Sequence, residues 1–448
     1  MTFRRASAVA LGTVVTVLLW PAAALAGDCG EVSYQVEGGT ALDCGGASAF
    51  VAAAAIGGTV LALAVAAAAA SYAAGGMPKP ELDALIDAQT TTGDPTTAAT
   101  SAASAAADPA AARAVASAVE DFGLAGDAQA TQAVADAYAV TRHYVAPFVL
   151  RVARTMLPSF HAAAAADPAH KVVFVGRDGE ALALATKELD PEFFREHGVS
   201  VVISRAVGEA ALRDLEKFFQ QTAPEHRRLQ ADFRRDIPDT DLRRQAQHLA
   251  TYLRGKGIPI GEPGSVVTLV DSSFKGSVPA MLSEMFRQTT FDAHLIWHGQ
   301  VRLEKPLRVT MTGHVQEAPI GDRGAVWETL VYEHLLRGPL SSPKRVGADG
   351  VPSQTWEHRT ENPKEGLVRS VISPRYLPDV VRDAVRAAAQ QAIVDYARTI
   401  AAAANPDAEL EEGFDDFRRH VRNWWDDTGE VPEPFRELLD SFVYKPAK

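Results

Sequence analysis

The sequence predicts an α/β protein with a largely parallel sheet flanked by helices, preceded by a signal and transmembrane segment and followed by a helical extension. Short apolar runs alternate with helical stretches over residues 171–345, and strands that alternate with helices form a parallel sheet. Two of these runs, 172–175 and 266–270, end directly in a polar loop that contains glycine. The uncharged run 47–77 is long enough to cross the roughly 30 Å core of a bilayer as a helix.

Length and charge limit what this protein can be. The chain has 448 residues and a formal net charge of −12, so we expect either one large α/β domain with extensions or two domains. The acidic balance argues against a general nucleic-acid binder. The sequence also lacks the ligand spacing of a zinc site, a dinucleotide glycine pattern and a Ser-His-Asp signature.

The start of the chain has the features of an exported segment. Two arginines precede an apolar run with a small-residue end, which predicts a signal peptide over residues 1–26; an uncleaved membrane anchor is the alternative. Residues 27–46 contain both cysteines of the chain, Cys29 and Cys44. This predicts a short exported loop closed by a disulfide, with two free thiols as the alternative.

The next segments place the rest of the chain relative to the membrane. Residues 47–77 predict a transmembrane helix. Residues 78–107, rich in Ala, Thr, Ser and Asp, predict a disordered linker. The arginines at the start favour a cytoplasmic N-terminus, so the loop 27–46 is exported and the helix 47–77 brings the chain back to the cytoplasm. After signal cleavage, we therefore expect a single-pass protein of the cell membrane whose main domain faces the cytoplasm. An exported main domain is the alternative.

Helical sequence over residues 108–170 leads into the predicted sheet, because apolar side chains recur there at three- and four-residue spacing. The first loop motif follows the strand at 172–175. Its residues are Gly176, Arg177, Asp178 and Gly179, and a helix begins near Glu180. An arginine on a glycine-flanked turn at a helix N-terminus is suited to an anion, because its guanidinium can grip phosphate oxygens beside free backbone donors. A capped turn with a surface arginine is the alternative.

The second loop motif follows the strand at 266–270, which ends on Asp271. The loop and the first helical residue are Ser272, Ser273, Phe274, Lys275, Gly276 and Ser277. Such a loop presents backbone N–H groups, hydroxyls and a lysine at the positive end of a helix dipole, which is the chemistry of holding a phosphate. The alternative is an ordinary strand-to-helix turn, since Ser, Gly and Asp also cap helices and form turns.

The remaining elements complete an α/β phosphate-binding domain at 171–345 and an extension at 346–448. Further strands are expected at 199–203, 293–297 and 307–311, and helical sequence at 206–257, 326–336, 377–404 and 414–443. The strand at 199–203 ends in Ser204 and Arg205, another polar and basic tip. We interpret the extension as a flap followed by helices on the domain surface.

The two loop motifs together resemble the phosphate loops of a type I phosphoribosyltransferase. The resemblance implies that the loop 176–179 faces pyrophosphate and that Asp271 faces the ribose hydroxyls. It also implies that the 5-phosphate is cradled by Ser273, Lys275, Gly276 and Ser277. The tip at Ser204 and Arg205 resembles the basic strand end that lies between the two loops in that family. The chain departs from the family at Ser272, where a second acid is usual.

A wider set of motifs over residues 171–343 is similar to a group of uncharacterised bacterial proteins. The set consists of the two loops, the Ser204-Arg205 tip, and a glutamate-bearing helix followed by Gly-Pro-x-Ser-Ser. Some of these proteins carry the set behind a haloacid-dehalogenase-like hydrolase domain.

These observations predict a membrane-anchored domain that binds a phosphorylated ribose or nucleotide together with Mg²⁺. Asp271 or Asp178 would hold the metal ion. The resemblance implies a phosphoribosyl or glycosyl transferase in which both aspartates take part in catalysis. The ligand-binding residues expected are Gly176, Arg177, Gly179, Arg205, Ser272, Ser273, Lys275, Gly276 and Ser277. One alternative is a non-catalytic, membrane-tethered sensor or scaffold, which the missing second acid favours. Another is a dehalogenase-type phosphohydrolase, although neither loop has the Asp-x-Asp spacing of that mechanism.

Overall fold

A computed structural model describes residues 108–223, 242–272, 274–300, 307–319, 326–338, 340–354, 367–369 and 372–446. The predicted signal peptide, disulfide, transmembrane helix and linker fall in residues 1–107, outside the described residues, as does Ser273. Within the described ranges, no helix is both long and apolar enough to cross a membrane.

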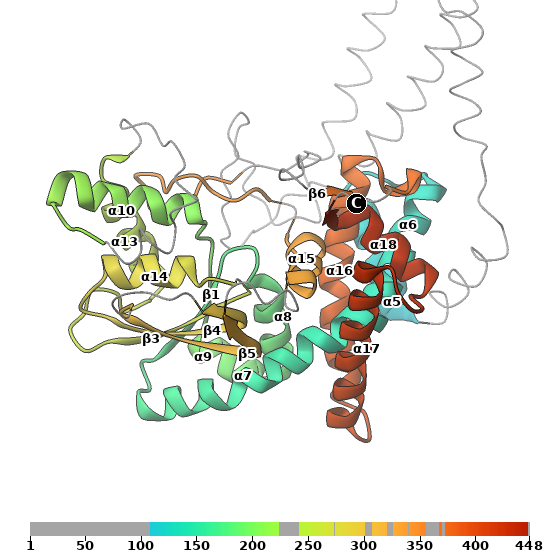
Figure 1. Cartoon of the computed structure of the whole chain (residues 1–448), viewed down its shortest axis with the longest axis horizontal. Coiled ribbons are helices and arrows are strands. Elements are labelled where there is room, and N and C mark those ends of the chain that lie inside the picture. The colour runs from blue at the N-terminus through green and yellow to red at the C-terminus, as the bar shows by residue number, and fades with distance from the viewer. Residues whose placement is uncertain are drawn as a thin grey trace, which may run out of the picture.

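A parallel sheet of five strands forms the centre of the α/β part (Figure 1). Its strands are β1 (Lys171–Val175), β2 (Gly198–Val201), β3 (Val266–Asp271), β4 (Thr290–Gln300) and β5 (Val309–Pro319). The prediction of a parallel α/β sheet is therefore confirmed. β2 ends two residues earlier than predicted, because the Val202 N–H donates to the hydroxyl of Tyr252, at 2.8 Å, instead of to a neighbouring strand.

The strand order β2-β1-β3-β4-β5 places a topological switch point between β1 and β3. From β1 the chain moves to one side to form β2, then returns to the other side of β1 to form β3. Open α/β sheets bind ligands outside the carboxyl ends of the strands at such a point. The two predicted phosphate loops follow the two strands that flank it.

Helices cover both faces of the sheet, because alternate side chains of each strand point to opposite sides. On one face lie α10 (Arg205–Phe219), α13 (Gln245–Gly255) and α14 (Ser277–Met285), and on the other α7 (Ala146–Ala166), α8 (Glu180–Leu189) and α9 (Pro191–His197) (Figure 1). In β1, Val173 and Val175 join the core under the first group, whereas Val172 and Phe174 join the core under the second.

A helical lobe next to the sheet is built from segments on both sides of it in the sequence (Figure 1). Its helices are α5 (Pro109–Asp121), α6 (Ala128–Val140), α15 (Val326–Leu335), α16 (Asp379–Ile400), α17 (Pro406–Asp426) and α18 (Glu433–Phe442). A π-helical turn at Thr141–Val145 links α6 to α7, and a 3-10 turn at Pro374–Tyr376 precedes α16. The short strands β6 (Leu367–Arg369) and β7 (Tyr444–Pro446) pair antiparallel.

The aromatic side chains near the C-terminus belong to the core of this lobe. Phe417, Trp424, Phe435 and Phe442 are each no more than 1% exposed. The helices α17 and α18 are therefore integral to the core and do not simply lie on the domain surface. An ion pair adds to this packing, because the half-buried Arg418 of α17 contacts the buried Glu328 of α15 at 2.7 Å.

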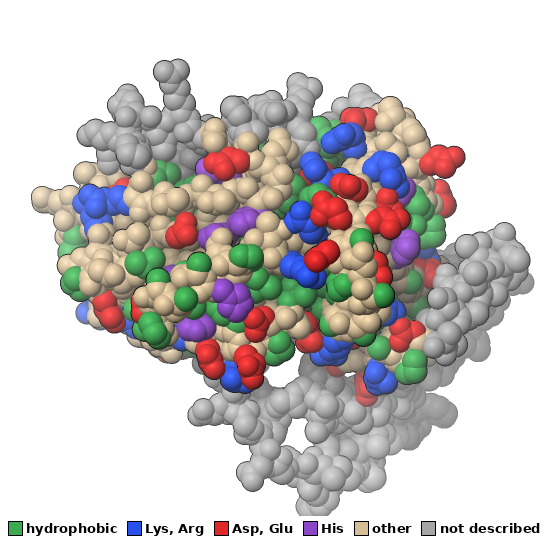
Figure 2. Space-filling model, turned by 90° about the horizontal axis from the view of Figure 1, so that it is seen from below, with side chains coloured by type: hydrophobic (Ala, Val, Ile, Leu, Met, Phe, Trp, Pro, Cys, Tyr) green, Lys and Arg blue, Asp and Glu red, His purple; other side chains and the backbone are tan. Residues whose placement is uncertain are grey.

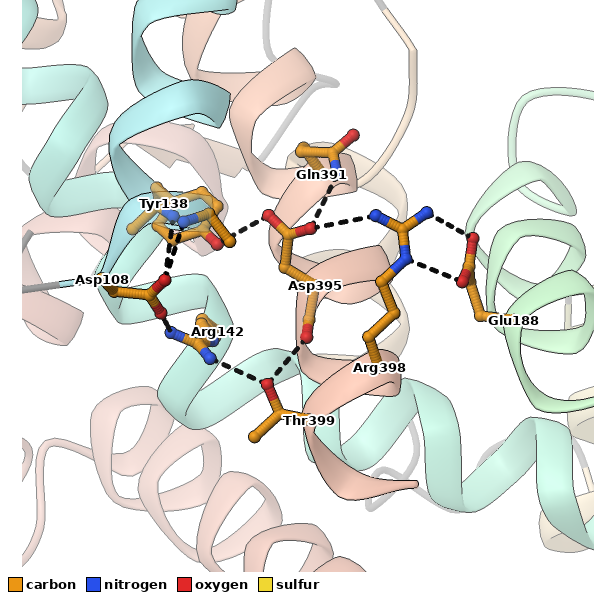
Figure 3. Close-up of polar contacts among 10 residues, drawn as sticks. Asp108, Tyr138, Arg142, Glu188, Gln391, Asp395, Arg398 and Thr399 are labelled. Carbon is orange, nitrogen blue, oxygen red and sulfur yellow. Dashed lines mark hydrogen bonds and ion pairs between the residues drawn. The ribbon is translucent and has the colours of Figure 1, made fainter. Parts of the chain in front are cut away.

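The long helix α16 connects the lobe to the sheet. Figure 3 shows Asp395 of α16 accepting a hydrogen bond from the Tyr138 hydroxyl of α6, at 2.8 Å. One turn further along, Arg398 donates to both carboxylate oxygens of Glu188 in α8, at 2.9 and 3.0 Å. Because Glu188 lies near the C-terminal end of α8, this ion pair fixes α16 to the end of α8 away from the first predicted phosphate loop.

Histidine side chains gather on the α7 and α9 side of the molecule, as Figure 2 shows. At the β5 edge, the Nδ1 atom of His294 lies 2.7 Å from the Nε2 atom of His314. The other ring nitrogen of His294 lies 3.3 Å from the carboxylate of Asp292. A second proton on this pair would place two cations side by side. Burial, and then His294, lower the pKa of His314 to about 4, against a smaller opposite effect of Asp292.

This histidine pair predicts acid-sensitive stability. His314 is neutral in the folded state down to about pH 4, whereas in the unfolded chain it takes up its proton near pH 6.5. The unfolded state therefore binds more protons in this window, and the free energy of unfolding should fall as the pH drops from 6.5 to 4, by at most about 3 kcal/mol. Urea unfolding at several pH values measures this change. A His314→Gln variant should show a weaker pH dependence, and an identical slope in both proteins would contradict the prediction.

Candidate functional site

The two predicted phosphate loops begin side by side. Phe174 of β1 lies in register with Val270 of β3, so Val175 and Asp271 end their strands at the same level of the sheet. The loop 176–179 and the loop 272–276 thus leave adjacent strands at the switch point. The structure brings together in space two motifs that are far apart in the sequence.

Close backbone packing shapes the first loop. Gly176 has a φ of +66°, and its N–H donates to the carbonyl of Val201 in β2 at 2.8 Å. A β-carbon at this position would lie 2.9 Å from the Ile203 carbonyl oxygen. A β-carbon on Gly179 would lie 2.7 Å from the Val175 nitrogen and 2.8 Å from its oxygen. Both positions therefore require glycine, which lets the backbone of this loop turn tightly over β1.

The second loop buries an acid and a hydroxyl at the end of β3. Asp271 is 4% exposed and Ser272 is fully buried. The Ser272 Oγ atom has no hydrogen-bond partner among the described residues. Further along, the Phe274 carbonyl accepts a hydrogen bond from the Gly299 N–H at 2.6 Å, which ties the loop to the extended end of β4. Buried polar atoms normally have a partner, so the hydroxyl of Ser272 is a candidate ligand contact.

Each loop leads into a helix whose N-cap residue is glycine. Gly179 precedes α8 and Gly276, with a φ of +60°, precedes α14, and neither helix has a side-chain hydrogen bond at its described N-terminus. By contrast, Asp108, Asp190 and Ser204 cap the helices that follow them. The first N–H groups of a helix that no side chain caps are available to an anion, and the helix dipole favours negative charge there.

Tyr332 is part of the site although the sequence analysis did not select it. Its hydroxyl is buried and has no hydrogen-bond partner among the described residues. Burial, and then the carboxylates of Asp178 and Asp271, raise the pKa of Tyr332 well above its ordinary value, against a smaller opposite effect of the Leu182 backbone. The phenol therefore stays protonated, as a donor near both carboxylates. The helical spacing of the sequence could have pointed to Tyr332, because Glu328, Val331, Tyr332 and Leu335 lie on one face and are buried. A buried tyrosine hydroxyl normally has a hydrogen-bond partner.

Glu180, the first residue of α8, is a second residue that the sequence analysis did not select. Its side chain lies against Gly338, where a β-carbon would approach its Oε2 atom to 2.8 Å. Burial raises the pKa of Glu180, while a hydrogen bond from Gln390 of α16 acts in the opposite direction.

The other predicted site residues lie around this centre. Arg205 is exposed at the start of α10, directly after the tip of β2. Lys275 is partly exposed in the second loop, while Gly276 and Ser277 are buried.

Asp178 and Asp271 fit the expected magnesium ion by their chemistry. Both are carboxylates that follow adjacent strands, and both raise the pKa of Tyr332. The part of the chain that the structure describes contains no group of three or more metal-ligating side chains. Mg²⁺ needs no such cage, because it is commonly held by one or two carboxylates together with the phosphates of its ligand.

No protein-family model matches this chain, and no curated protein is significantly similar to it in sequence.

Proposed function

We propose that this protein binds a phosphorylated ribose or nucleotide ligand, with Mg²⁺, at the carboxyl ends of β1 and β3. The first loop would hold a diphosphate through Arg177 and its backbone donors. The second loop would hold a 5-phosphate through Lys275 and the start of α14. Between them, Asp271 would contact the ribose hydroxyls, and Mg²⁺ on Asp178 or Asp271 would neutralise charge on the phosphates.

The strongest support is the arrangement of two glycine-shaped loops side by side at the switch point. Each loop ends at a helix N-terminus without a side-chain cap among the described residues. At the start of the second loop lie a buried acid, Asp271, and the buried hydroxyl of Ser272, which has no hydrogen-bond partner among the described residues. A structural turn needs no unpaired hydroxyl, because leaving a buried polar group without a partner costs about 1–3 kcal/mol.

The reaction that the family resemblance implies is phosphoribosyl transfer. A nucleophile of the acceptor would form a bond to ribose C1 as the bond from C1 to the pyrophosphate oxygen breaks, and pyrophosphate would leave with both bonding electrons. A proton lost from the acceptor passes to solvent or to a neighbouring base. Asp271, which is buried at this position, would stabilise the positive charge that develops on the ribose.

Ligand binding without turnover is a second candidate. Ser272 stands where the resembling family has a second acid, and it offers a neutral hydroxyl in a fully buried position. One carboxylate stabilises a cationic transition state less than two do. Release of pyrophosphate from the bound ligand in the presence of candidate acceptor bases would identify a transferase, whereas binding with no release across an acceptor panel would identify a sensor or scaffold.

The two-loop assignment predicts opposite effects for two charge-removing variants. Arg177→Gln should weaken binding of inorganic pyrophosphate by about 10-fold to 100-fold, because a charge-assisted contact contributes about 1.5–3 kcal/mol. It should leave ribose 5-phosphate binding nearly unchanged. Lys275→Gln should do the reverse. Calorimetric titration of each variant with both compounds checks the assignment, and equal effects on both compounds would contradict it.

Ser272→Ala separates a ligand contact from a packing role. Removing a buried hydroxyl that has no described partner should leave the free energy of unfolding unchanged or raise it by about 1 kcal/mol. Affinity for the phosphorylated ligand should nevertheless fall by about 5-fold to 10-fold, because one hydrogen bond is lost. Urea unfolding and calorimetry measure the two quantities. A destabilised variant with unchanged affinity would show that the hydroxyl serves the fold and not the ligand.

A further inference from the structure

Residues 340–346, here called the strap, cross the tips of β1 and β2 on the ligand side of the sheet. The Leu340 carbonyl accepts a hydrogen bond from Arg177 of the first loop, at 3.5 Å. The Pro343 carbonyl accepts one from the Ser204 hydroxyl at the end of β2. Two carbonyls of one segment therefore occupy donors at two neighbouring strand tips.

Further contacts hold the strap at its sides. The Ser341 carbonyl accepts from Gln354 at 3.0 Å. Val346 is buried, its N–H donates to Gln245 of α13 at 3.2 Å, and its carbonyl lies 3.3 Å from the His248 ring. Val346 is thus the fixed end of the strap, and the contacts at Leu340 and Pro343 lie toward the other end.

The donors under the strap suit an anion better than a carbonyl. A guanidinium bonds a phosphate oxygen more strongly than a neutral carbonyl, because both partners are then charged. The bond from Arg177 to Leu340 is also long, at 3.5 Å. The Ser204 hydroxyl accepts from the Val207 N–H at 3.1 Å to cap α10, so its one proton is committed to the strap. At Ser204, an anion can take the hydroxyl proton only by replacing the Pro343 carbonyl. At Arg177, an anion competes with the Leu340 carbonyl for the guanidinium.

We infer that the strap is an internal competitor for the diphosphate end of the site, which a diphosphate displaces from Arg177 and Ser204. This inference rests on the proposed function, because it needs a diphosphate at the first loop. The observed affinity is then the intrinsic affinity multiplied by the fraction of molecules in which the strap is released. A substitution that lies outside the two loops and weakens the attachment of the strap should therefore raise the affinity for a diphosphate.

Gln354→Ala tests this directly, because Gln354 holds the strap but belongs to neither loop. Losing one neutral hydrogen bond should raise the affinity for magnesium pyrophosphate by about 2-fold to 10-fold. The control is Gln391→Ala, the same substitution at a site away from the strap, where the side chain donates to the Asp395 carboxylate, at 3.0 Å, within α16. The control should bind pyrophosphate like the original protein.

Hydrogen exchange of the full-length chain gives an independent readout. Pyrophosphate should speed exchange at the backbone amides of the strap while it protects the first loop. Weaker binding by Gln354→Ala, or protection of the strap by pyrophosphate, would overturn the inference and make the strap a closing part of the site. No pyrophosphate binding by the original protein or by Gln354→Ala, with both folded, would instead remove the proposed function and the inference with it. Binding by Gln354→Ala alone would support both.

Discussion

Asp271→Asn should reduce the affinity for phosphoribosyl pyrophosphate and Mg²⁺ by about 100-fold or more, because contacts of a carboxylate with hydroxyls and a metal ion are charge-assisted and each is worth about 1.5–3 kcal/mol. The asparagine has the same shape, so the buried position at the end of β3 remains filled. Circular dichroism and urea unfolding should show a folded protein of similar stability. Calorimetric titration of the variant and the original protein measures the loss.

Asp292→Asn is the matched control for this experiment. Asp292 lies in register with Thr268 of β3, three positions before Asp271, and so lies away from the carboxyl ends of the strands. The same chemical change on the same sheet should leave ligand affinity unchanged. Equal losses in the two variants would mean that net charge, and not the position at the switch point, governs binding. Unchanged affinity in Asp271→Asn would remove this residue from the site.

Gly179→Ala should destabilise the protein and disable the first loop. The new β-carbon would lie 2.7 Å from the Val175 nitrogen and 2.8 Å from its oxygen. These are backbone atoms of β1, which cannot turn away as a side chain does, so the loop and the start of α8 have to shift. Such overpacking costs about 1–3 kcal/mol. Urea unfolding measures this cost, and pyrophosphate binding should be lost as well, because Arg177 and the α8 amides move with the loop.

Gly255→Ala provides the comparison for this substitution. Gly255 is the last residue of α13, and a β-carbon there meets nothing within 4 Å. Alanine should be neutral at this position or stabilise the protein by up to about 1 kcal/mol, because it favours helix over glycine. A Gly179→Ala protein as stable as the original, with pyrophosphate binding intact, would show that close packing over β1 does not shape the loop.

Much of the α/β part could be predicted from local sequence. A run such as 172–175 followed by a glycine loop and a helix has few other interpretations, and these features reappear in β1 and α8. The strand order could not be predicted in this way, because it depends on which distant strands pair. That order is what makes the two loops neighbours.

The parts of the site that were missed lack a local signature. Tyr332 comes from a helix of the lobe, and only the packing of α15 near the strand ends brings it near Asp178 and Asp271. The strap has no hydrophobic period, so its path over Arg177 and Ser204 could not be read from its residues. The lobe itself joins α5 and α6 to α16 across the whole sheet domain, which is a non-local arrangement.

Titration of the full-length chain with phosphoribosyl pyrophosphate in the presence of Mg²⁺ is the most direct test of the site between β1 and β3. We expect saturable binding of one ligand per chain in the micromolar range, weakened by inorganic pyrophosphate as a competitor and lost in Asp271→Asn. A folded chain that shows no binding at millimolar ligand would contradict a phosphate site at this switch point.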